Sequence, residues 1–231
     1  MTFYTAVGNL EQVTGGVNKH HPTVKAGGEK LIVDIPEAVI WTLLSGRIMD
    51  MPNLEKMYTS RVEALGIENM PGCGAYIDRL LQRGIVVQGT GETGHDALFD
   101  LLRDLLIVPV KLSLPKKLSL FVRMLVKYRA PLHLATRHFR KPHLSYCERE
   151  VLKLVSATPM SAAEIITCIE KGHGPITSIE DVLSAIYGDE YTTFANIGDE
   201  ARLAANEMAC LTAIANMYLR QIVTFERTDC M

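Results

Sequence analysis

A glycine-rich turn near residue 90 has the spacing that phosphate chemistry uses. Residues 89–94 read Gly-Thr-Gly-Glu-Thr-Gly, which follows the β-branched residues 85–87 and precedes an expected helix. In a dinucleotide site, such a G-x-G-x-x-G sequence lets the backbone approach a pyrophosphate at a helix N-terminus. Here no acidic residue ends a following strand, and no alternation of strands and helices follows to build a parallel sheet. The sequence therefore favours a wing tip or hinge over nucleotide binding, and we predict no cofactor.

Cysteine and histidine offer two further kinds of chemistry. Cys73 stands at an expected helix N-terminus, where the helix dipole lowers the pKa of a thiol, but the surrounding Pro-Gly-Cys-Gly is more typical of an ordinary turn. His133, His138 and His143 are five residues apart, a step that separates their rings by about 140° around a helix. The sequence contains no G-x-S-x-G, H-E-x-x-H or G-x-x-x-x-G-K-[ST]. We predict neither a catalytic residue nor a metal site.

The strongest feature is a run of positive charge in the middle of the chain. Residues 103–143, the basic belt, contain ten Lys and Arg and one acid, for a charge of +9. Residues 1–102 carry −4 and residues 144–231 carry −7. Cations at this density neutralise the phosphates of a nucleic acid. The competing partners are an anionic membrane surface and the two acidic flanks of the chain itself.

Length and composition set the class of protein. The 231 residues fit one large domain or two small ones, and 48% hydrophobic residues suffice for packed cores. No segment approaches the ~18–20 uninterrupted apolar residues of a membrane-spanning helix, and the N-terminus lacks the pattern of a secretory signal. Five cysteines are scattered without a C-x-x-C, which is typical of free thiols in a reducing compartment. We therefore expect a cytoplasmic protein.

The first 95 residues show the signals of a small sheet around three helices. Turn residues, helix-capping residues and helical spacing of apolar side chains mark the boundaries. The expected elements are a strand over 30–34, an antiparallel partner for it between Phe3 and Val13, a helix from Pro36 to Leu44, a helix capped by Asn53, a helix over 75–83 and a strand over 85–87. This order is the plan of a winged helix, in which two helices hold a third against a small sheet.

Two stretches of this region also resemble PqqD-type domains. They are AVIWTLLSGRIMDMPNLEKMY and IDRLLQRGIVVQG, and in that family a short sheet precedes an "IW-x-LL-x-G" helix. The resemblance covers about residues 28–90. It implies a domain that binds the leader peptides of modified natural products, with an extended peptide added to the strand at residues 31–33.

The rest of the chain is expected to be mainly helical. Leucines and valines recur at helical spacing within residues 96–143, which predicts an ordered basic bridge with its charged heads outward. Ser145 and Glu148 have the spacing of a capping box. The expected elements are helices over 96–107, 118–128, 132–140, 147–156, 162–170, 178–187 and 199–219, and a strand over 222–225.

We predict a mainly helical α+β fold with small antiparallel sheets. Two winged-helix-like lobes, residues 1–95 and 144–231, flank the helical bridge at 96–143. The leading hypothesis is a non-enzymatic, dimeric DNA-binding regulator, in which the third helix reads base edges and the basic belt binds phosphates. The predicted DNA-binding residues are Tyr76, Arg79, Gln82, Arg83, Lys116, Lys117, Arg123, Lys127, Arg129, Arg137, Arg140 and Lys141.

The alternative hypothesis is a PqqD-like module that recognises a peptide or a protein. An extended segment of the partner would pair with the strand at 31–33 and pack on the first and third helices. The predicted peptide-binding residues are Leu31, Ile32, Val33 and Trp41. A membrane surface is the least favoured of the three partners.

Overall fold

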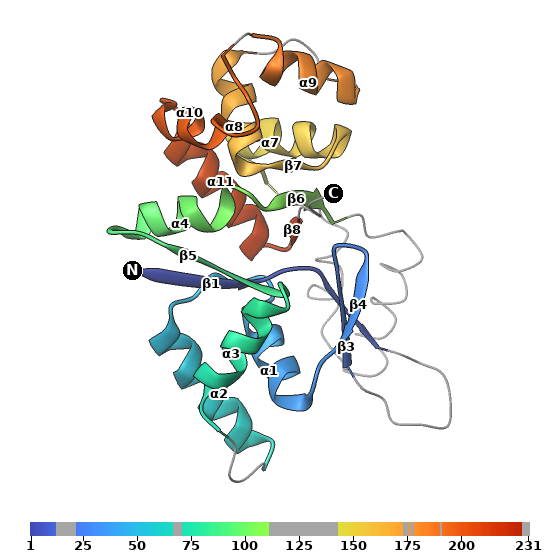
Figure 1. The fold of residues 1–231 in the computed structure, drawn as a ribbon, viewed down its shortest axis with the longest axis vertical. Helices are drawn as coiled ribbons and strands as arrows, with labels where there is room; N and C mark the ends of the chain where they lie inside the picture. Colours follow the sequence, from blue (N-terminus) through green and yellow to red (C-terminus); the bar gives the residue numbers. More distant parts are fainter. Residues whose placement is uncertain are drawn as a thin grey trace.

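The chain folds around two separate groups of buried side chains. The computed structural model describes residues 1–12, 22–66, 71–110, 143–172, 176, 178–189 and 191–227. Figure 1 shows one group of helices below a pair of long strands and a second group above them. Each group has its own hydrophobic core. We call residues 1–90 the N-terminal half and residues 94–227 the C-terminal half. The α+β class predicted from the sequence, mainly helical with small antiparallel sheets, is confirmed.

The strands of the N-terminal half form two antiparallel sheets. β1 (Thr2–Ala6) pairs with β5 (Val86–Thr90), and β2 (Asn9–Gln12), β3 (Pro22–Ala26) and β4 (Glu29–Ile32) form a three-stranded meander. The strand expected near residue 30 is present, but the partner expected between Phe3 and Val13 is wrong, because β4 pairs with β3. Gly27 and Gly28 both have positive φ, which makes the tight turn that joins β3 and β4.

Three helices complete the N-terminal half. They are α1 (Ile35–Leu44), α2 (Met51–Ala64) and α3 (Cys73–Gln82). Asp34 caps α1 and forms a capping box with Glu37. The predicted cap of α2 is wrong by one turn, because Asp50 is the N-cap and accepts a hydrogen bond from the Asn53 N–H at 3.0 Å. A carboxylate at this position satisfies one of the free N–H groups of the first turn.

The segment after β5 belongs to the C-terminal core. α4 (Gly94–Leu102) is followed by β6 (Leu106–Pro109), which pairs with β7 (Met160–Ser161) on one side and β8 (Val223–Glu226) on the other. The helix expected over 96–107 is therefore wrong in its last turn. Ile107 is fully buried between two strands, and sheet pairing of this β-branched run overrides its helical spacing. The other two helices expected in the bridge, over 118–128 and 132–140, lie outside the described residues.

Five further helices lie in the described residues of the C-terminal half. They are α7 (Tyr146–Ala157), α8 (Ala162–Lys171), α9 (Ile179–Tyr187), α10 (Ile197–Leu203) and α11 (Glu207–Leu219). The capping box of Ser145 and Glu148 is confirmed. The single long helix expected over 199–219 is wrong, because the backbone turns extended at Ala204 and separates α10 from α11.

The two halves repeat one order of elements around a central strand. In the N-terminal half, Tyr4 of β1 pairs with Met49 on one side and with Gln88 of β5 on the other. In the C-terminal half, Ile107 of β6 pairs with Met160 of β7 and with Phe225 of β8. In both, a helix precedes the methionine and another helix begins just after it, at α2 or α8. The central strands β1 and β6 therefore hold equivalent positions.

The C-terminal ends of α3 and α11 are also equivalent. α3 has Arg83 as its C-cap and α11 has Arg220, and in both a residue with positive φ follows, Gly84 (φ 66°) or Gln221 (φ 56°). The next residue, Ile85 or Ile222, donates its N–H to a carbonyl five residues earlier, at 3.2 and 2.8 Å. Such a left-handed cap turns the chain out of the helix and into a strand. Here those strands are β5 and β8.

Tyr218 of α11 joins the two halves. Its ring stacks on Phe225 with centroids 4.0 Å apart, inside the C-terminal core. Its hydroxyl reaches the N-terminal half, where it lies 2.9 Å from the Thr5 hydroxyl, 3.2 Å from the Ala6 carbonyl and 3.3 Å from the Leu44 carbonyl. Burial raises the pKa of this phenol. A neutral hydroxyl thus satisfies polar groups at a dry junction.

Candidate functional site

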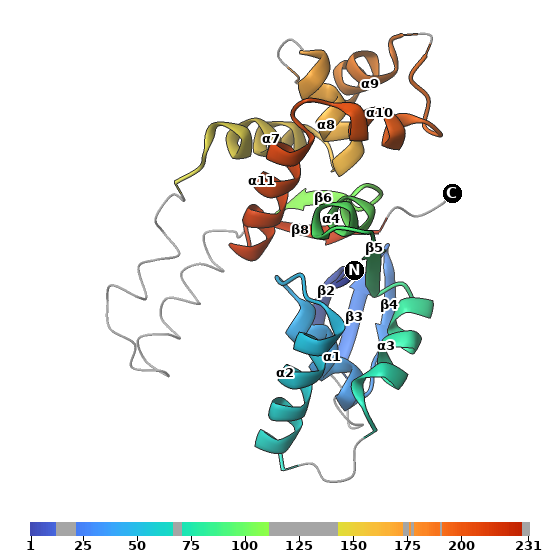
Figure 2. The same cartoon turned by 90° about the vertical axis from the view of Figure 1, so that its left-hand side faces the viewer.

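β4 forms one edge of the three-stranded sheet, and half of its backbone groups point away from that sheet. Figure 2 shows β4 as the outer strand of the meander. Hydrogen-bonded and non-bonded pairs alternate along an antiparallel ladder, starting from the residues that flank a two-residue turn. The Val33 N–H donates to the Pro22 carbonyl at 3.0 Å, which fixes this alternation. The N–H and C=O groups of Lys30 and Ile32 therefore face outward. Among the described strands, none pairs with this edge.

The side chains predicted to bind a peptide divide between this edge and the core. Ile32 is 65% exposed at the end of β4, and Leu31 is partly buried against the N-terminal core. Val33 and Trp41 are buried in that core. The Trp41 indole N–H donates to the Val7 carbonyl at 3.2 Å. The structure therefore gives Val33 and Trp41 the role of packing residues beneath the edge, because an apolar ring with a satisfied N–H has no surface left to offer.

The two arginines predicted to read DNA are held by carboxylates of α1. Arg79 lies 2.9 Å from Asp34 and 2.6 Å from Glu37, and Arg83 lies 2.9 Å from the other carboxylate oxygen of Glu37. Glu37 is only 1% exposed. The hydrogen bonds that Arg79 donates to Asp34 and Glu37 raise the pKa of Arg79. Two cations and two anions balance at this site, so α3 presents little net positive charge.

Arg83 also touches the candidate edge. Its second terminal nitrogen donates to the Ile32 carbonyl, one of the outward-facing groups of β4. A guanidinium that bridges Glu37 and Ile32 links the start of α1 to the end of β4. The Lys30 side chain pairs with Glu11 at 2.8 Å. Within the described residues, the outward backbone groups of Lys30 and the Ile32 N–H therefore have no hydrogen-bond partner.

The remaining predicted residues of α3 are Gln82 and Tyr76, which differ in burial. Gln82 is exposed, and Tyr76 is half-buried with the Arg79 guanidinium 5.6 Å from its ring centroid. Tyr58 of α2 meets Tyr76 at a centroid distance of 6.4 Å. The structure thus brings Tyr76, Arg79 and Arg83 together with Asp34 and Glu37. The sequence carried a signal for this cluster in the capping-box spacing of Asp34 and Glu37, but not in any motif for the arginines.

The phosphate-binding residues predicted in the basic belt are not placed. They lie outside the described residues, which stop at Val110 and resume at His143. They are Lys116, Lys117, Arg123, Lys127, Arg129, Arg137, Arg140 and Lys141. At the start of the belt, Arg103 pairs with Asp104 at 3.0 Å.

The glycines of the 89–94 sequence serve packing. A Cβ added to Gly89 would lie 2.3 Å from the Leu101 N and 2.4 Å from the Ala97 O. One added to Gly91 would lie 2.4 Å from the Asp96 Cβ. These glycines let α4 approach β5 backbone to backbone. Thr93 caps α4 with a capping box to Asp96, so the first turn of this helix is satisfied by its own residues.

Cys73 is an inert core thiol. It is 2% exposed, and burial raises its pKa to about 11. Within the described parts of the chain, no three His, Cys, Asp or Glu side chains gather as metal ligands would. The same parts contain no helix long and apolar enough to cross a membrane.

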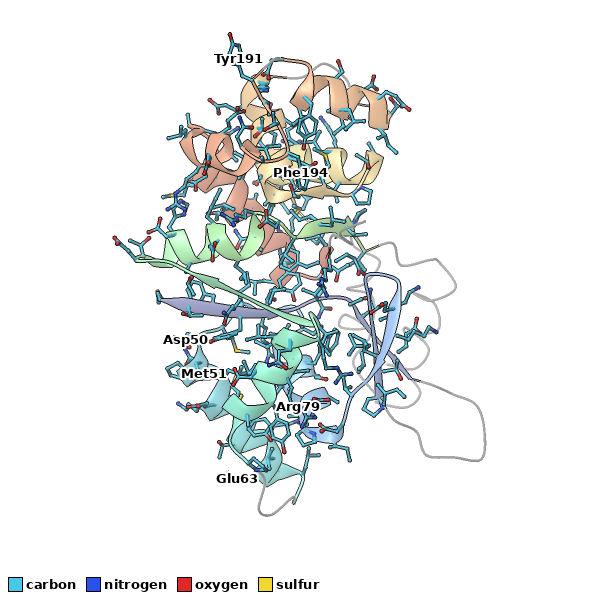
Figure 3. All side chains as sticks on the ribbon, viewed as in Figure 1. Asp50, Met51, Glu63, Arg79, Tyr191 and Phe194 are labelled. Atoms are coloured by element: carbon cyan, nitrogen blue, oxygen red, sulfur yellow. The ribbon has the colours of Figure 1, made fainter. Side chains whose placement is uncertain are left out.

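A second exposed apolar surface, which the sequence reading missed, lies on the C-terminal half. Lys171 holds the loop after α9 through Asp189 and Thr192, at 2.5 and 2.6 Å. This loop carries Tyr191 and Phe194, which are 80% and 78% exposed, and Figure 3 shows Tyr191 projecting from one end of the molecule. No periodicity marks these aromatics, because they stand in a loop between helices.

The chain was compared with known protein families, curated proteins and solved structures. No protein-family model matches the chain, and no curated protein or solved structure matches it.

Proposed function

We propose that the N-terminal half recognises a peptide or protein segment, which binds in extended form along the outer edge of β4. The observation that carries this proposal is the set of outward backbone groups at Lys30 and Ile32, beside an Ile32 side chain that is 65% exposed. An added strand gains main-chain hydrogen bonds from such an edge, and its side chains supply selectivity. The resemblance of residues 28–90 to PqqD-type domains implies the same class of partner.

Charge balance at α3 favours this function over DNA reading. Specific contacts to base edges need free arginine donors, whereas Arg79 and Arg83 are paired with Asp34 and Glu37. Freeing both arginines would leave the buried Glu37 carboxylate with an unmet charge, which is costly. DNA binding stays the second candidate because residues 103–143 carry a charge of +9. The expected homodimer and cytoplasmic location also remain predictions.

A proline at position 32 tests strand addition. Proline removes the outward N–H of Ile32, and an edge strand tolerates proline where the N–H faces solvent. The probe is a phage-displayed library of random linear peptides, selected on the immobilised full chain. Enriched peptides are then titrated by fluorescence anisotropy. We expect Ile32→Pro to abolish binding and Ile32→Ala, which keeps the N–H, to weaken it only a few-fold.

The matched pair separates backbone from side-chain recognition. Trp41 fluorescence reports whether each variant keeps the N-terminal core, since Trp41 is the single tryptophan of the chain. Equal affinity of folded Ile32→Pro and wild type would rule out strand addition. Failure to enrich any peptide would count against the function itself.

Duplex DNA of random sequence tests the second candidate. Binding in a mobility-shift assay at low salt should weaken steeply as salt rises, because counterion release drives it. Charge reversal at Arg123 and Lys127 should reduce it, and Ile32→Pro should leave it unchanged. Absence of a shift at ~50 mM salt would remove DNA as a partner.

A further inference from the structure

Two cysteines of the C-terminal half lie together where α7 meets α11. The Cys147 Sγ is 3.8 Å from the Cys210 Sγ. Cys147 is half-buried, whereas Cys210 is fully buried. The two residues are 63 positions apart in sequence, so no local spacing such as C-x-x-C announces the pair. A disulfide between them requires the two sulfurs to approach to about 2 Å.

We propose that Cys147 and Cys210 form a dithiol site that reacts with low-molecular-weight disulfides and closes to an intramolecular disulfide. Cys147 is the attacking thiol because it is the one that solvent reaches. Cys210 is the resolving thiol because it lies behind Cys147 within the core.

The two thiols are electrostatically different, which supports this order. Cys147 is the second residue of α7, and the positive end of a helix dipole stabilises a thiolate there. The hydrogen bond between the two thiols lowers the pKa of Cys147. The same hydrogen bond, together with burial, raises the pKa of Cys210.

The reaction balances as two thiol–disulfide exchanges. The Cys147 thiolate attacks one sulfur of the small disulfide, forms a mixed disulfide and releases one thiolate. Cys210 then gives up its proton and attacks the Cys147 sulfur, which releases the second thiolate. The dithiol loses two electrons, the small disulfide gains them, and the two protons end on the released thiols.

The N-terminal half contains a natural comparison. Cys73 is ten residues before the C-cap Arg83, as Cys210 is ten residues before the C-cap Arg220. The position equivalent to Cys147, two residues after the N-cap, is Pro36. At the position equivalent to Cys147, Cys73 thus has a proline in place of a thiol, and burial raises its pKa to about 11, so it should be inert to small disulfides.

The test uses the full chain and oxidised glutathione. After an acid quench and alkylation of the remaining thiols, intact mass and non-reducing peptide mapping locate each bond. We expect a bond between Cys147 and Cys210 in the wild type. Cys210→Ser should stop at one glutathione on Cys147, and Cys147→Ser should carry none at Cys210. Oxidation confined to Cys230, or a Cys210→Ser variant without glutathione on Cys147, overturns the proposal.

A second measurement needs no substitution. Iodoacetamide should alkylate Cys147 about tenfold faster, or more, than Cys73 and Cys168, because only thiolates react and only Cys147 is partly accessible. The rate at Cys147 should rise with pH and level off well below the pKa of about 11 of the other two thiols. Equal rates at the three positions would overturn the assignment of Cys147 as the attacking thiol.

Discussion

The two halves share one arrangement of helices around a central strand, but they differ in the segments inserted into it. A buried glutamate occupies the third position of α1 and of α7, Glu37 and Glu148. It pairs with the arginine at the C-cap of α3 and of α11, Arg83 and Arg220. In the N-terminal half the added segment is the β2-β3-β4 meander, which leaves an open edge. The C-terminal half instead has α9 and α10 inserted between α8 and α11. The equivalent helices carry the buried ion pairs. The inserted segments carry the exposed side chains of Ile32, Tyr191 and Phe194.

The ion pairs are shared in position but differ in strength. Glu37 holds two arginines, and Arg79 also bonds to Asp34. Glu148 holds Arg220 alone, which also donates to the His143 carbonyl at 3.0 Å. Removing a glutamate should therefore cost the N-terminal half more than the C-terminal half.

Glu37→Ala should have the largest effect. It leaves Arg83 without its anion, while Arg79 keeps Asp34. Breaking a buried pair from one side costs about 3–5 kcal/mol, which is an upper bound here because both guanidinium groups reach solvent. Unfolding by urea, followed through Trp41 fluorescence, measures the loss in the N-terminal half. The matched control is Glu63→Ala on the exposed side of α2 (Figure 3), which should change stability by less than ~0.5 kcal/mol. Equal effects of the two variants would show that the ion pair does not hold α1 to α3.

Glu148→Ala should cost about 1.5–3 kcal/mol, the value of hydrogen bonds to a charged group. Burial raises the pKa of Glu148, but hydrogen bonds from Ser145 and the Arg220 guanidinium outweigh it, so this pKa lies below its ordinary value of 4.5. The pair thus stabilises the folded state fully above pH 4.5 and loses its contribution as the pH falls further. Hydrogen exchange of α7 and α11 should show the variant and the wild type converging in acid. A difference that persists at low pH would contradict this linkage.

How far the sequence predicted these features depends on how local each signal is. Asp34 and Ser145 were readable as helix starts because a cap and its partner are three residues apart. The partner of β4 was predicted wrongly. The sequence does not show whether the strand pairs across the Gly27-Gly28 turn, as it does in the structure, or with the more distant segment between Phe3 and Val13. Sequence could not pair Arg83 with Glu37 or Arg220 with Glu148. The first pair forms only when α1 packs on α3, and the second only when α7 packs on α11.

The same limit applies to the candidate sites. The resemblance to PqqD-type domains implied Ile32 as a peptide contact, and the structure places it at an exposed edge. Trp41 was predicted beside it, yet its indole fills the core, because sequence alone does not tell which side of a helix faces inward at a junction. Cys147 and Cys210 come together from distant helices, so spacing gave no sign of them.

Tyr218→Phe tests whether the halves are coupled at their junction. The variant keeps the ring on Phe225 but leaves the buried Thr5 hydroxyl and two carbonyls without the phenol, at a cost of about 1–2 kcal/mol. Trp41 fluorescence and hydrogen exchange of α11 should report one transition in the wild type and two separated transitions in the variant. Coincident transitions in Tyr218→Phe would mean that other contacts couple the halves.

Gln221→Gly should have the smallest effect, and its sign is the opposite of the others. Gln221 has a φ of 56° at the position where the N-terminal half has Gly84. A left-handed residue other than glycine costs about 1–2 kcal/mol, and the greater freedom of unfolded glycine returns part of the gain. The net stabilisation should be about 0.5–1 kcal/mol in the C-terminal half. The matched variant Gly84→Ala should destabilise the N-terminal half, since its Cβ would also meet the Arg227 guanidinium. If both substitutions shifted stability in the same direction, the two caps would not be equivalent. The similarity of the two halves would then not extend beyond α3 and α11.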